Sequence, residues 1–551
     1  MEKIWLKSYS PGVPAEINPD HYSSLIDMFE ESCRKYRDSP AFYSLGVTLT
    51  YQEIDFYSRA FAAYLQTHFK LKKGDRVALM MPNVLQYPIA LFGALRLGLT
   101  IVNVNPLYTV PELVHQLKDA GAETIIVLEN FAHTVEDALS EIKLKNIIVT
   151  QVGDLLPPFK AKLIQFFLKY IRRKIPAWTI SNAISFKKIL EEGEKLNFSH
   201  VEINNTDIAF LQYTGGTTGV AKGAMLTHRN ILSNIEQATA WFHSLLTPGK
   251  EIIITALPLY HIFSLTANSL FFFKLGGLNV LIANPRNLPD MISEMKKFKF
   301  TGITGVNTLF NGLLHAPAFS KLDFSHLKLT LGGGMAVQRA VAEKWQAVTK
   351  EPLLEAYGLT ETSPCVTINP VNLHSYNGTI GLPVPSTDVC FLDEDEKEVP
   401  LGKAGELAVK GPQVMSGYWN NPNETAKAFT KDGWFLTGDI AAMDEKGFVR
   451  ILERKKDMIL VSGFNVYPSE VEDVLTSMPG IAEAAVVGVY DENSTEAVKA
   501  FIVATDPAIT KEDVIHFAKK SLTGYKVPKY VEFCKELPKT NVGKILRRAL
   551  R

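Results

Sequence analysis

Short apolar runs alternate with helix-period segments through the first half of the chain, and this alternation restricts the fold more than any other feature. Residues 76–81 and 100–104 are typical of buried strands, and the apolar stretch 85–97 between them is typical of a helix. Another helix is expected after Thr109, because Thr109 and Glu112 have the spacing of a capping box and a proline stands in the first turn. Strands that alternate with helices form parallel sheets covered by helices. The sequence therefore predicts an α/β fold.

The pattern changes twice towards the C-terminus. Between residues 378 and 449 the strand-like segments come close together between proline and glycine turns, which predicts a smaller β-rich subdomain. The charged stretch 452–457 then lies between two apolar regions, and we place a domain boundary there. Residues 1–454 are expected to form a large N-terminal domain of layered α/β subdomains that includes the β-rich part. Residues 455–551 are expected to form a small α+β domain.

The composition argues against several classes of protein. The chain carries 58 Lys and Arg and 58 Asp and Glu residues, so it lacks the basic excess on which nucleic-acid binding rests. The four cysteines form no CxxC pair and the start has no apolar segment of signal-peptide length, which favours free thiols and a cytoplasmic protein. Residues 252–273 are uncharged and long enough to cross a bilayer, but Pro258 and His261 interrupt them. A buried strand followed by a buried helix is favoured there.

Glycine, threonine and lysine crowd into residues 213–223, directly after the apolar run 208–211. Glycine lets backbone amides approach an anion, hydroxyls donate to phosphate oxygens, and lysine supplies positive charge. The spacing is not that of a Walker A loop. The segment predicts a phosphate-binding loop, with a flexible surface turn as the alternative. Its candidate residues are Tyr213, Thr214, Gly215, Gly216, Thr217, Thr218, Gly219 and Lys222.

This loop and six further motifs, in the same order, resemble those of the adenylate-forming superfamily of acyl-CoA synthetases, luciferases and peptide-synthetase adenylation domains. The resemblance covers the chain from about residue 22 to the end and is strongest to the bacterial long-chain fatty-acid–CoA ligases. It implies an acyl-CoA synthetase/luciferase-like fold with a mobile C-terminal domain. It also implies ATP-dependent ligation of long-chain fatty acids to coenzyme A through an acyl-AMP, with release of AMP and pyrophosphate. The other motifs are residues 258–261, 332–334, 355–361, 433–439, 453–457 with 463–468, and 538–544.

The resemblance assigns roles around ATP residue by residue. Glu361 is similar to the residue that holds Mg²⁺ against the ATP phosphates, and Thr360 to one that donates to the α-phosphate. Lys222 would hold the β- and γ-phosphates. Asp439 and Arg454 are similar to the residues at the ribose, where an acceptor-only carboxylate suits two hydroxyl donors. The positions implied beside the adenine are Gly332, Gly333, Gly334, Tyr357 and Gly358.

The resemblance also implies how the two half-reactions are separated. Lys544 is similar to the catalytic lysine, whose ammonium neutralises the charge of carboxylate and phosphate as they meet. Lys456 is similar to the pivot about which the small domain rotates, after which Gly463 would line the pantetheine channel of coenzyme A. His261 is similar to the residue at the acyl side of the pocket. A core histidine with a satisfied hydrogen bond is the alternative for His261.

A basic amphipathic segment bears on where the protein works. Between Asp154 and Glu191 the chain has eight basic residues and no acidic one, and apolar residues recur at helical spacing from Leu163 to Ile175. Such a pattern over residues 159–175 is typical of a helix in peripheral contact with an anionic membrane, here the inner face of the cell membrane. The alternative is a helix packed on the N-terminal domain with a solvated basic face.

Several functions stay open on sequence alone. One is a fatty acyl-AMP ligase that passes its acyl group to a carrier protein, and another is a non-catalytic, membrane-associated fatty-acid-binding protein. A medium-chain or aryl substrate also remains, because pocket depth cannot be read from a sequence. An amino-acid adenylation domain is disfavoured, because residues 259–264 offer no Asp for an amino group. The sequence also leaves open whether the protein forms a homodimer.

Overall fold

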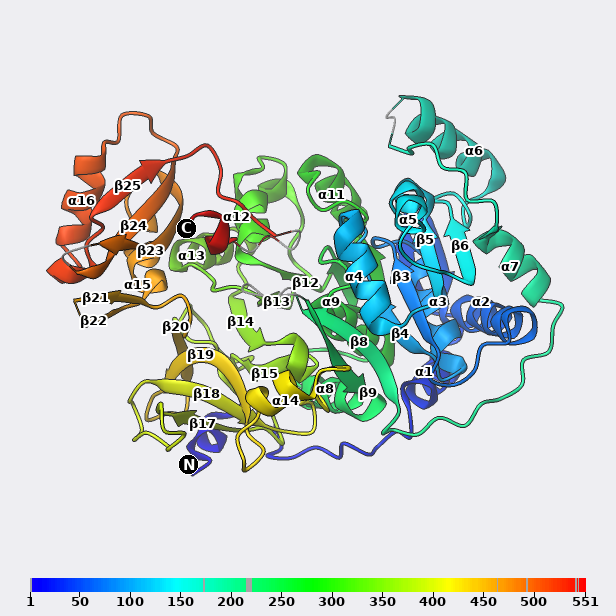
Figure 1. Cartoon of the computed structure of the whole chain (residues 1–551), viewed down its shortest axis with the longest axis horizontal. Helices are drawn as coiled ribbons and strands as arrows, with labels where there is room; N and C mark the ends of the chain where they lie inside the picture. Colours follow the sequence, from blue (N-terminus) through cyan, green and yellow to red (C-terminus); the bar gives the residue numbers. More distant parts are fainter. Residues whose placement is uncertain are drawn as a thin grey trace.

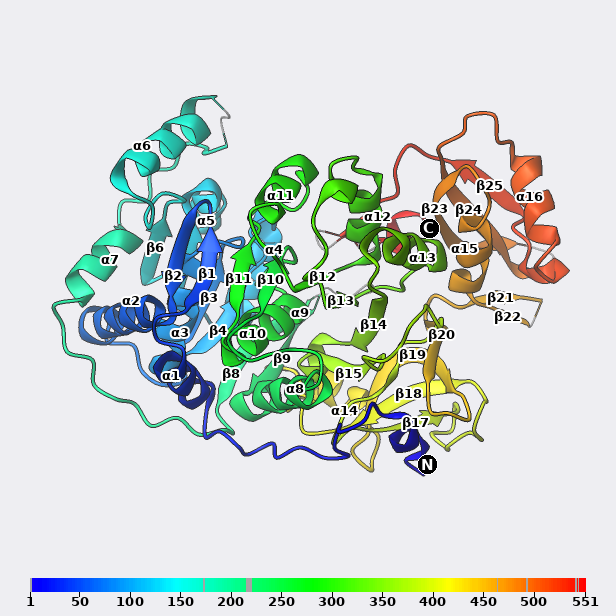
Figure 2. The same ribbon diagram turned by 180° about the vertical axis from the view of Figure 1, so that it is seen from behind.

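The structure is a computed structural model, shown from two sides in Figures 1 and 2. It describes residues 2–171, 174–214, 221–462, 464–491, 494–540, 543 and 545–551.

A seven-stranded sheet occupies one end of the large domain (Figure 1). Its strand order is β7–β6–β5–β3–β4–β8–β9, and every pair is parallel except β8–β9. The helix expected after Thr109 is confirmed as α4 (Val110–Ala120), and the Thr109 amide donates to Glu112 Oε2 at 2.8 Å, as in a capping box. The strands are β3 (Arg76–Met80), β4 (Thr100–Asn103), β5 (Thr124–Leu128), β6 (Asn146–Thr150), β7 (Ala183–Ser185), β8 (Ile208–Thr214) and β9 (Lys222–Thr227).

A nine-stranded sheet has the order β16–β15–β14–β13–β12–β10–β11–β1–β2, with a parallel centre and antiparallel edges. Its strands are β1 (Pro40–Ser44), β2 (Val47–Thr50), β10 (Ile252–Thr255), β11 (Leu278–Leu281), β12 (Gly302–Gly305), β13 (Leu329–Gly332), β14 (Leu353–Gly358), β15 (Cys365–Ile368) and β16 (Leu382–Pro383). The predicted α/β fold is therefore confirmed.

Buried aromatic rings tie together the helices that belong to these two sheets. Phe29 of α1 (Leu25–Lys35) lies 4.1 Å from Phe92 of α3 (Gln86–Arg96) and 5.2 Å from Phe273 of α10 (Phe271–Lys274), measured between ring centroids. All three rings are fully buried. Since each buried aromatic side chain contributes a few kcal/mol, this cluster stabilises the joint between the sheets.

The uncharged stretch 252–273 forms a strand and then a helix, as expected. After β10, the chain enters α9 (Ile262–Ser264), a π-helical segment (Leu265–Leu270) and α10. Within the described part of the chain, none of the helices combines the length and apolar character that crossing a bilayer requires.

The β-rich subdomain is confirmed as an antiparallel sheet in the order β17–β18–β19–β20. It consists of β17 (Asp388–Leu392), β18 (Gly405–Lys410), β19 (Phe435–Met443) and β20 (Val449–Arg454). The next strand belongs to a separate C-terminal sheet, which Figure 1 shows in orange and red. The elements of that domain are β21 (Ile459–Val461), β22 (Phe464–Val466), α15 (Pro468–Thr476), β23 (Ile481–Asp491), β24 (Thr495–Ala504), α16 (Lys511–Lys519) and β25 (Tyr530–Phe533). The change of sheet falls beside the boundary placed after residue 454, and the division itself stays a prediction.

The basic amphipathic segment projects from the end of the molecule remote from the C-terminal domain (Figures 1 and 2). It forms α6 (Pro158–Phe166), which continues as a π-helical turn (Phe167–Ile171), and none of these residues is buried. Arg172 and Arg173 lie outside the described residues.

A buried arginine fixes three helices of the N-terminal domain. The Arg96 side chain in α3 is 1% exposed, and its Nη1 donates to Glu30 Oε1 of α1 at 2.6 Å. Its Nη2 pairs with Asp55 of α2 (Tyr51–Tyr64), and the guanidinium lies 5.0 Å from the ring centre of Phe29. Removal of one partner from a buried ion pair leaves an uncompensated charge, which is costly.

We expect Arg96→Ala to lower the free energy of unfolding by about 2–4 kcal/mol, because the charge-assisted hydrogen bonds of this buried side chain to the partly exposed Glu30 and Asp55 are lost. Urea unfolding measures this change. Arg59→Ala is the matched control: Arg59 Nη2 lies 3.8 Å from the same two carboxylates but its side chain is 51% exposed. Its loss is expected to be below about 1 kcal/mol. Equal losses in the two variants would contradict the role given to Arg96.

Candidate active site

A cavity of about 2100 Å³ collects residues from both sheets of the N-terminal domain, from the β-rich subdomain and from the C-terminal domain. Thr214 ends β8, Gly333 follows β13 and Gly358 ends β14, so the carboxyl ends of these strands meet at the cavity. Ligands bind at such strand ends in open α/β sheets. The predicted site residues that line it are Tyr213, Thr214, Lys222, His261, Gly333, Gly334, Tyr357, Gly358, Thr360, Glu361, Asp439, Arg454 and Lys456.

Gly332 is described but does not line the cavity. A Cβ added to it would lie 2.7 Å from Leu353 Cδ2 and 2.8 Å from Val337 Cγ2, so this glycine allows close packing within the sheet. The sequence pattern could not separate Gly332 from the two glycines that follow it, because it does not show that strand β13 ends at the first glycine of the run. The predicted residues outside the described part of the chain are Gly215, Gly216, Thr217, Thr218, Gly219, Gly463 and Lys544, and their roles stay predictions.

Asp439, Arg454 and Tyr357 form one polar cluster in the cavity wall. The register of β19 and β20 pairs Asp439 with Arg454, and Arg454 Nε lies 2.7 Å from Asp439 Oδ1. The Tyr357 hydroxyl donates to Asp439 Oδ2. Burial, together with the Asp439 carboxylate, raises the pKa of Tyr357 well above its usual value, so its hydroxyl stays a donor. Arg454 and Tyr357 thus hold the buried Asp439 carboxylate in a fixed orientation.

Glu361 and Lys222 both lie beside Tyr418, a residue that the sequence analysis did not identify. Glu361 lies in a short turn after β14 and is 9% exposed, and its Oε1 accepts a hydrogen bond from Tyr418 Oη at 2.7 Å. The Lys222 ammonium lies 5.1 Å from the centre of the Tyr418 ring and pairs with Glu424 of α14 (Pro422–Ala428). The hydrogen bond from Lys222 lowers the pKa of Glu424 to about 2. Tyr418 follows Glu361 by 57 residues in sequence, so no local pattern indicates their contact.

His261 lines the cavity and also caps a helix. Its Nδ1 accepts a hydrogen bond from the Phe263 amide at 3.3 Å, at the start of α9. The cavity wall also has an apolar part, which includes Ala267 of the π-helical segment, a kind of turn often found at functional sites. His261 thus has the hydrogen bond that the structural alternative requires, but it is only partly buried and also lines the cavity, so its role stays a prediction. Other apolar lining residues are Ala238, Phe242, Phe263, Phe271 and Leu331.

The chain on both sides of Lys544 reaches the N-terminal domain. Thr540 and Ile545 line the cavity, and the Gly543 carbonyl accepts a hydrogen bond from Thr308 Oγ1 of α12 (Asn307–His315) at 3.5 Å. The C-terminal segment therefore forms part of the same cavity wall as Asp439 and Tyr357.

Within the described residues, no three His, Cys, Asp or Glu side chains come together as a metal site. Glu361 therefore offers a single carboxylate, with Oε2 left for a further ligand beside the bond from Tyr418 to Oε1. This arrangement fits Mg²⁺, which binds one or two carboxylates together with substrate phosphates and waters.

Comparison with known proteins assigns the chain to a family. The family model described as AMP-binding enzyme matches residues 29–419, and the model described as AMP-binding enzyme C-terminal domain matches residues 470–544. The chain belongs to the AMP-binding enzyme family. This AMP-binding enzyme is 58% identical to the long-chain-fatty-acid–CoA ligase of Yersinia pestis over 100% of its own length and 98% of the relative's. It is 40% identical to the long-chain-fatty-acid–CoA ligase of Bacillus subtilis, with the same shares covered.

Solved structures have the same architecture. The crystal structure of ATP-bound MatB from Rhodopseudomonas palustris matches with a TM-score of 0.81 at 27% identity, over 96% of this AMP-binding enzyme and 98% of MatB. The similarity in fold therefore covers both the N-terminal and the C-terminal domain of this enzyme.

Glu355 is a buried carboxyl group in the wall of the same cavity. It lies in β14, is 6% exposed, and its Oε1 accepts a hydrogen bond from the Val337 amide at 3.1 Å. Burial raises the pKa of Glu355 from 4.5 to about 8. Below pH 4.5 the carboxyl group is protonated in both the folded and the unfolded enzyme, so its burial costs little. Between pH 4.5 and 8 the unfolded chain loses a proton that the folded enzyme retains, and the stability falls.

We therefore expect Glu355→Gln to remove this fall, because the amide keeps the acceptor for Val337 and cannot ionise. The melting temperature of the variant relative to the wild type is expected to rise from pH 5 to pH 8, and differential scanning calorimetry measures it. Glu512→Gln, at an exposed position, is the control and is expected to give a difference that does not change with pH. A constant difference for Glu355→Gln would refute the raised pKa.

Proposed function

We propose that this AMP-binding enzyme is a long-chain-fatty-acid–CoA ligase that works through an acyl-adenylate. The observation that carries the proposal is the 58% identity, over the whole chain, to a relative of that name. The cavity supports it, because its polar wall suits a nucleotide and its apolar wall suits an acyl chain.

In the proposed complex, ATP lies along the polar wall. The Asp439 carboxylate accepts hydrogen bonds from the ribose hydroxyls, and Arg454 adds positive charge beside it. Tyr357 and the glycines at 333, 334 and 358 lie against the adenine. Lys222 leaves Glu424 and binds the phosphates together with the loop that follows Thr214. Glu361 would hold Mg²⁺, which supplies charge neutralisation at the phosphates when bound.

In the first half-reaction a carboxylate oxygen of the fatty acid attacks the α-phosphorus, and the bond to pyrophosphate breaks. Thr360 donates to the α-phosphate, His261 lies at the acyl side, and the Lys544 ammonium neutralises the charge that gathers between the reactants. In the second half-reaction the coenzyme A thiol attacks the acyl carbon, loses its proton to solvent, and AMP leaves. Rotation of the small domain about Lys456 removes Lys544 and brings Gly463 to the pantetheine channel.

We expect the purified protein to release pyrophosphate from ATP and Mg²⁺ when a long-chain fatty acid is present, and to form the thioester only when coenzyme A is added. Acids of graded length give the chain preference. Pyrophosphate release that does not depend on any added fatty acid would refute the ligase activity. Transfer to a carrier protein in place of coenzyme A would support the acyl-AMP ligase, and binding of fatty acid without any release would support the binding protein.

The variant Lys544→Ala tests the role of the catalytic lysine in this assay. It is expected to lower pyrophosphate release by roughly a hundredfold or more, because the charge of the meeting reactants is no longer neutralised. It is expected to convert preformed acyl-adenylate and coenzyme A to thioester at the wild-type rate. Equal losses in both half-reactions would contradict the separation by domain rotation.

We also propose that the enzyme is cytoplasmic and touches an anionic membrane through α6 and the turn that follows it. Phe159 is 82% exposed and Tyr170 62% exposed, and Lys162 and Lys169 lie exposed among them. Polar contacts join the segment to the N-terminal domain; for example, Gln165 Nε2 donates to Glu129 Oε1 at 2.7 Å. Several of its apolar side chains are therefore exposed to solvent. Exposed aromatic and basic residues on one helix suit anionic lipid, from which fatty acids would be taken up. The exposed apolar residues are Phe159, Leu163, Phe166, Phe167, Tyr170 and Ile171.

We expect the double variant Phe159→Ser and Tyr170→Ser to bind phosphatidylglycerol vesicles roughly tenfold more weakly or worse, since two inserted rings are lost. Vesicle sedimentation measures this, and activity on a short, soluble acid is expected to be unchanged. Phe56→Ser is the control, because Phe56 is 50% exposed on α2, away from this segment. Unchanged sedimentation of the double variant would refute the membrane contact.

A further inference from the structure

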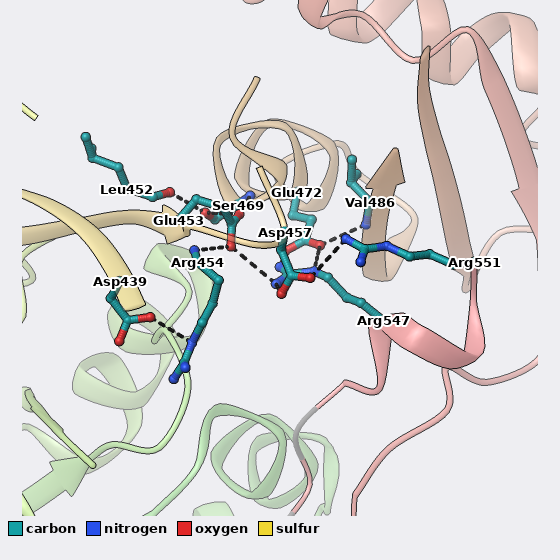
Figure 3. A network of polar contacts seen from close by, with 10 residues as sticks. All are labelled: Asp439, Leu452, Glu453, Arg454, Asp457, Ser469, Glu472, Val486, Arg547 and Arg551. Carbon is teal, nitrogen blue, oxygen red and sulfur yellow. Dashed lines mark hydrogen bonds and ion pairs between the residues drawn. The ribbon is translucent and has the colours of Figure 1, made fainter. Parts of the chain in front are cut away.

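A cluster of charged side chains surrounds the turn at residues 455–457, between β20 and the C-terminal sheet (Figure 3). Glu453 precedes this turn. Ser469 and Glu472 of α15, and Arg547 and Arg551 near the C-terminus, follow it. The contacts in the cluster that join these segments are of two kinds: some join two residues that both follow Lys456, and others cross Lys456 to reach Leu452 or Glu453.

The Glu453 side chain receives the contacts that cross the turn, except for one that reaches the Leu452 carbonyl. The residue is buried, with 3% of its surface exposed, and its Oε2 accepts a hydrogen bond from the Ser469 amide at 2.9 Å. The Ser469 hydroxyl lies 2.9 Å from the same oxygen and 2.7 Å from the Leu452 carbonyl, and it donates to one of them at a time. Arg547 Nη1 lies 3.4 Å from Glu453 Oε1, which also accepts the amide of Arg454 at 2.9 Å.

The remaining contacts lie wholly on the C-terminal side. Arg547 binds Glu472 with two nitrogens, Nη2 at 2.7 Å and Nε at 3.2 Å, and Glu472 also accepts the Val486 amide. Arg551 Nη2 donates to Asp457 Oδ1 at 2.9 Å. A rotation about Lys456 would carry these pairs along intact. The same rotation would have to break the bonds from Glu453 to Ser469 and Arg547.

Arg547 also belongs to the segment that reaches the cavity. It follows Lys544 by three residues, and Thr540, Ile545 and Arg547 itself line the cavity. The orientation in which Glu453 is bound is therefore the one that keeps this segment beside Asp439 and Tyr357.

We propose that Glu453 is a positioning residue that holds the C-terminal domain in the orientation for adenylation, through Ser469 and Arg547. Its release accompanies the change to thioester formation. This inference rests on the proposed function, in which the two half-reactions use two orientations of that domain. Glu453 acts through the placement of the C-terminal segment and touches no reacting atom.

The test compares the two half-reactions in Glu453→Ala. Acid-dependent exchange of pyrophosphate into ATP is expected to fall roughly tenfold or more, because charge-assisted buried bonds are lost. Conversion of preformed acyl-adenylate and coenzyme A to thioester is expected to stay at the wild-type rate or to increase. Glu453→Gln keeps the size and removes the charge, and it replaces the alanine variant if that variant does not fold. Ser469→Ala keeps the amide donor and is expected to give a smaller shift in the same direction.

The readout is the ratio of the two rates, which a residue with a merely structural role would leave unchanged. Arg551→Gln is the matched control, because its contact to Asp457 does not cross Lys456, and the ratio is expected to stay at the wild-type value. Equal losses in both half-reactions for the Glu453 variants, or the same shift in Arg551→Gln, would overturn the inference. Wild-type protein without acid-dependent exchange would instead refute the proposed function, so the two failures are distinguishable.

Discussion

The ion pair between Asp439 and Arg454 is the contact on which the arrangement of the cavity depends. Antiparallel pairing of β19 and β20 makes the two residues direct neighbours, and Arg454 is the last residue of β20. A buried carboxylate without its partner is costly, so the end of this strand is held in place. At the same strand end, the backbone amide of Arg454 donates a hydrogen bond to the Glu453 side chain. One pair of strands thus fixes both a part of the cavity wall and the place where the chain leaves the β-rich sheet for the C-terminal sheet.

Parallel topology explains why distant parts of the chain meet at this pair. β8 of one sheet and β13 and β14 of the other end at the cavity, so Thr214, Gly333 and Gly358 share one wall. Side chains that follow the carboxyl ends of strands face a common crevice, whatever their separation in sequence. The C-terminal segment then covers this crevice through contacts such as Thr308 with Gly543. The cavity is therefore lined jointly by two sheets and by the C-terminal segment.

Local and motif-based features were predictable, and contacts between distant segments were not. The capping box at Thr109 needs only four neighbouring residues, so the sequence predicts the start of α4 correctly. The family resemblance places Asp439 and Arg454 together, and the strand register agrees. Nothing local indicates that Tyr418 donates to Glu361, that Glu424 pairs with Lys222, or that Ser469 reaches Glu453, because each depends on the assembled sheets. Gly332 was grouped with its two neighbours because sequence does not show where β13 ends.

The chemistry of the Glu453 contacts suits an orientation that has to be both held and released. If the two domains were held by an apolar interface, opening it would cost about 25 cal/mol of free energy for each Å² of apolar surface exposed to water, and the cost would grow with the area. Charged groups regain hydration when they separate, so the net strength of the Glu453 bonds is about 1.5–3 kcal/mol each, well below their strength in an apolar medium. A ligand has to bind one orientation only about 10⁴-fold better than the other to reverse a 99:1 preference. A few polar bonds at the turn can therefore favour one orientation of the C-terminal domain strongly. Substrate binding can still shift the equilibrium to the other orientation.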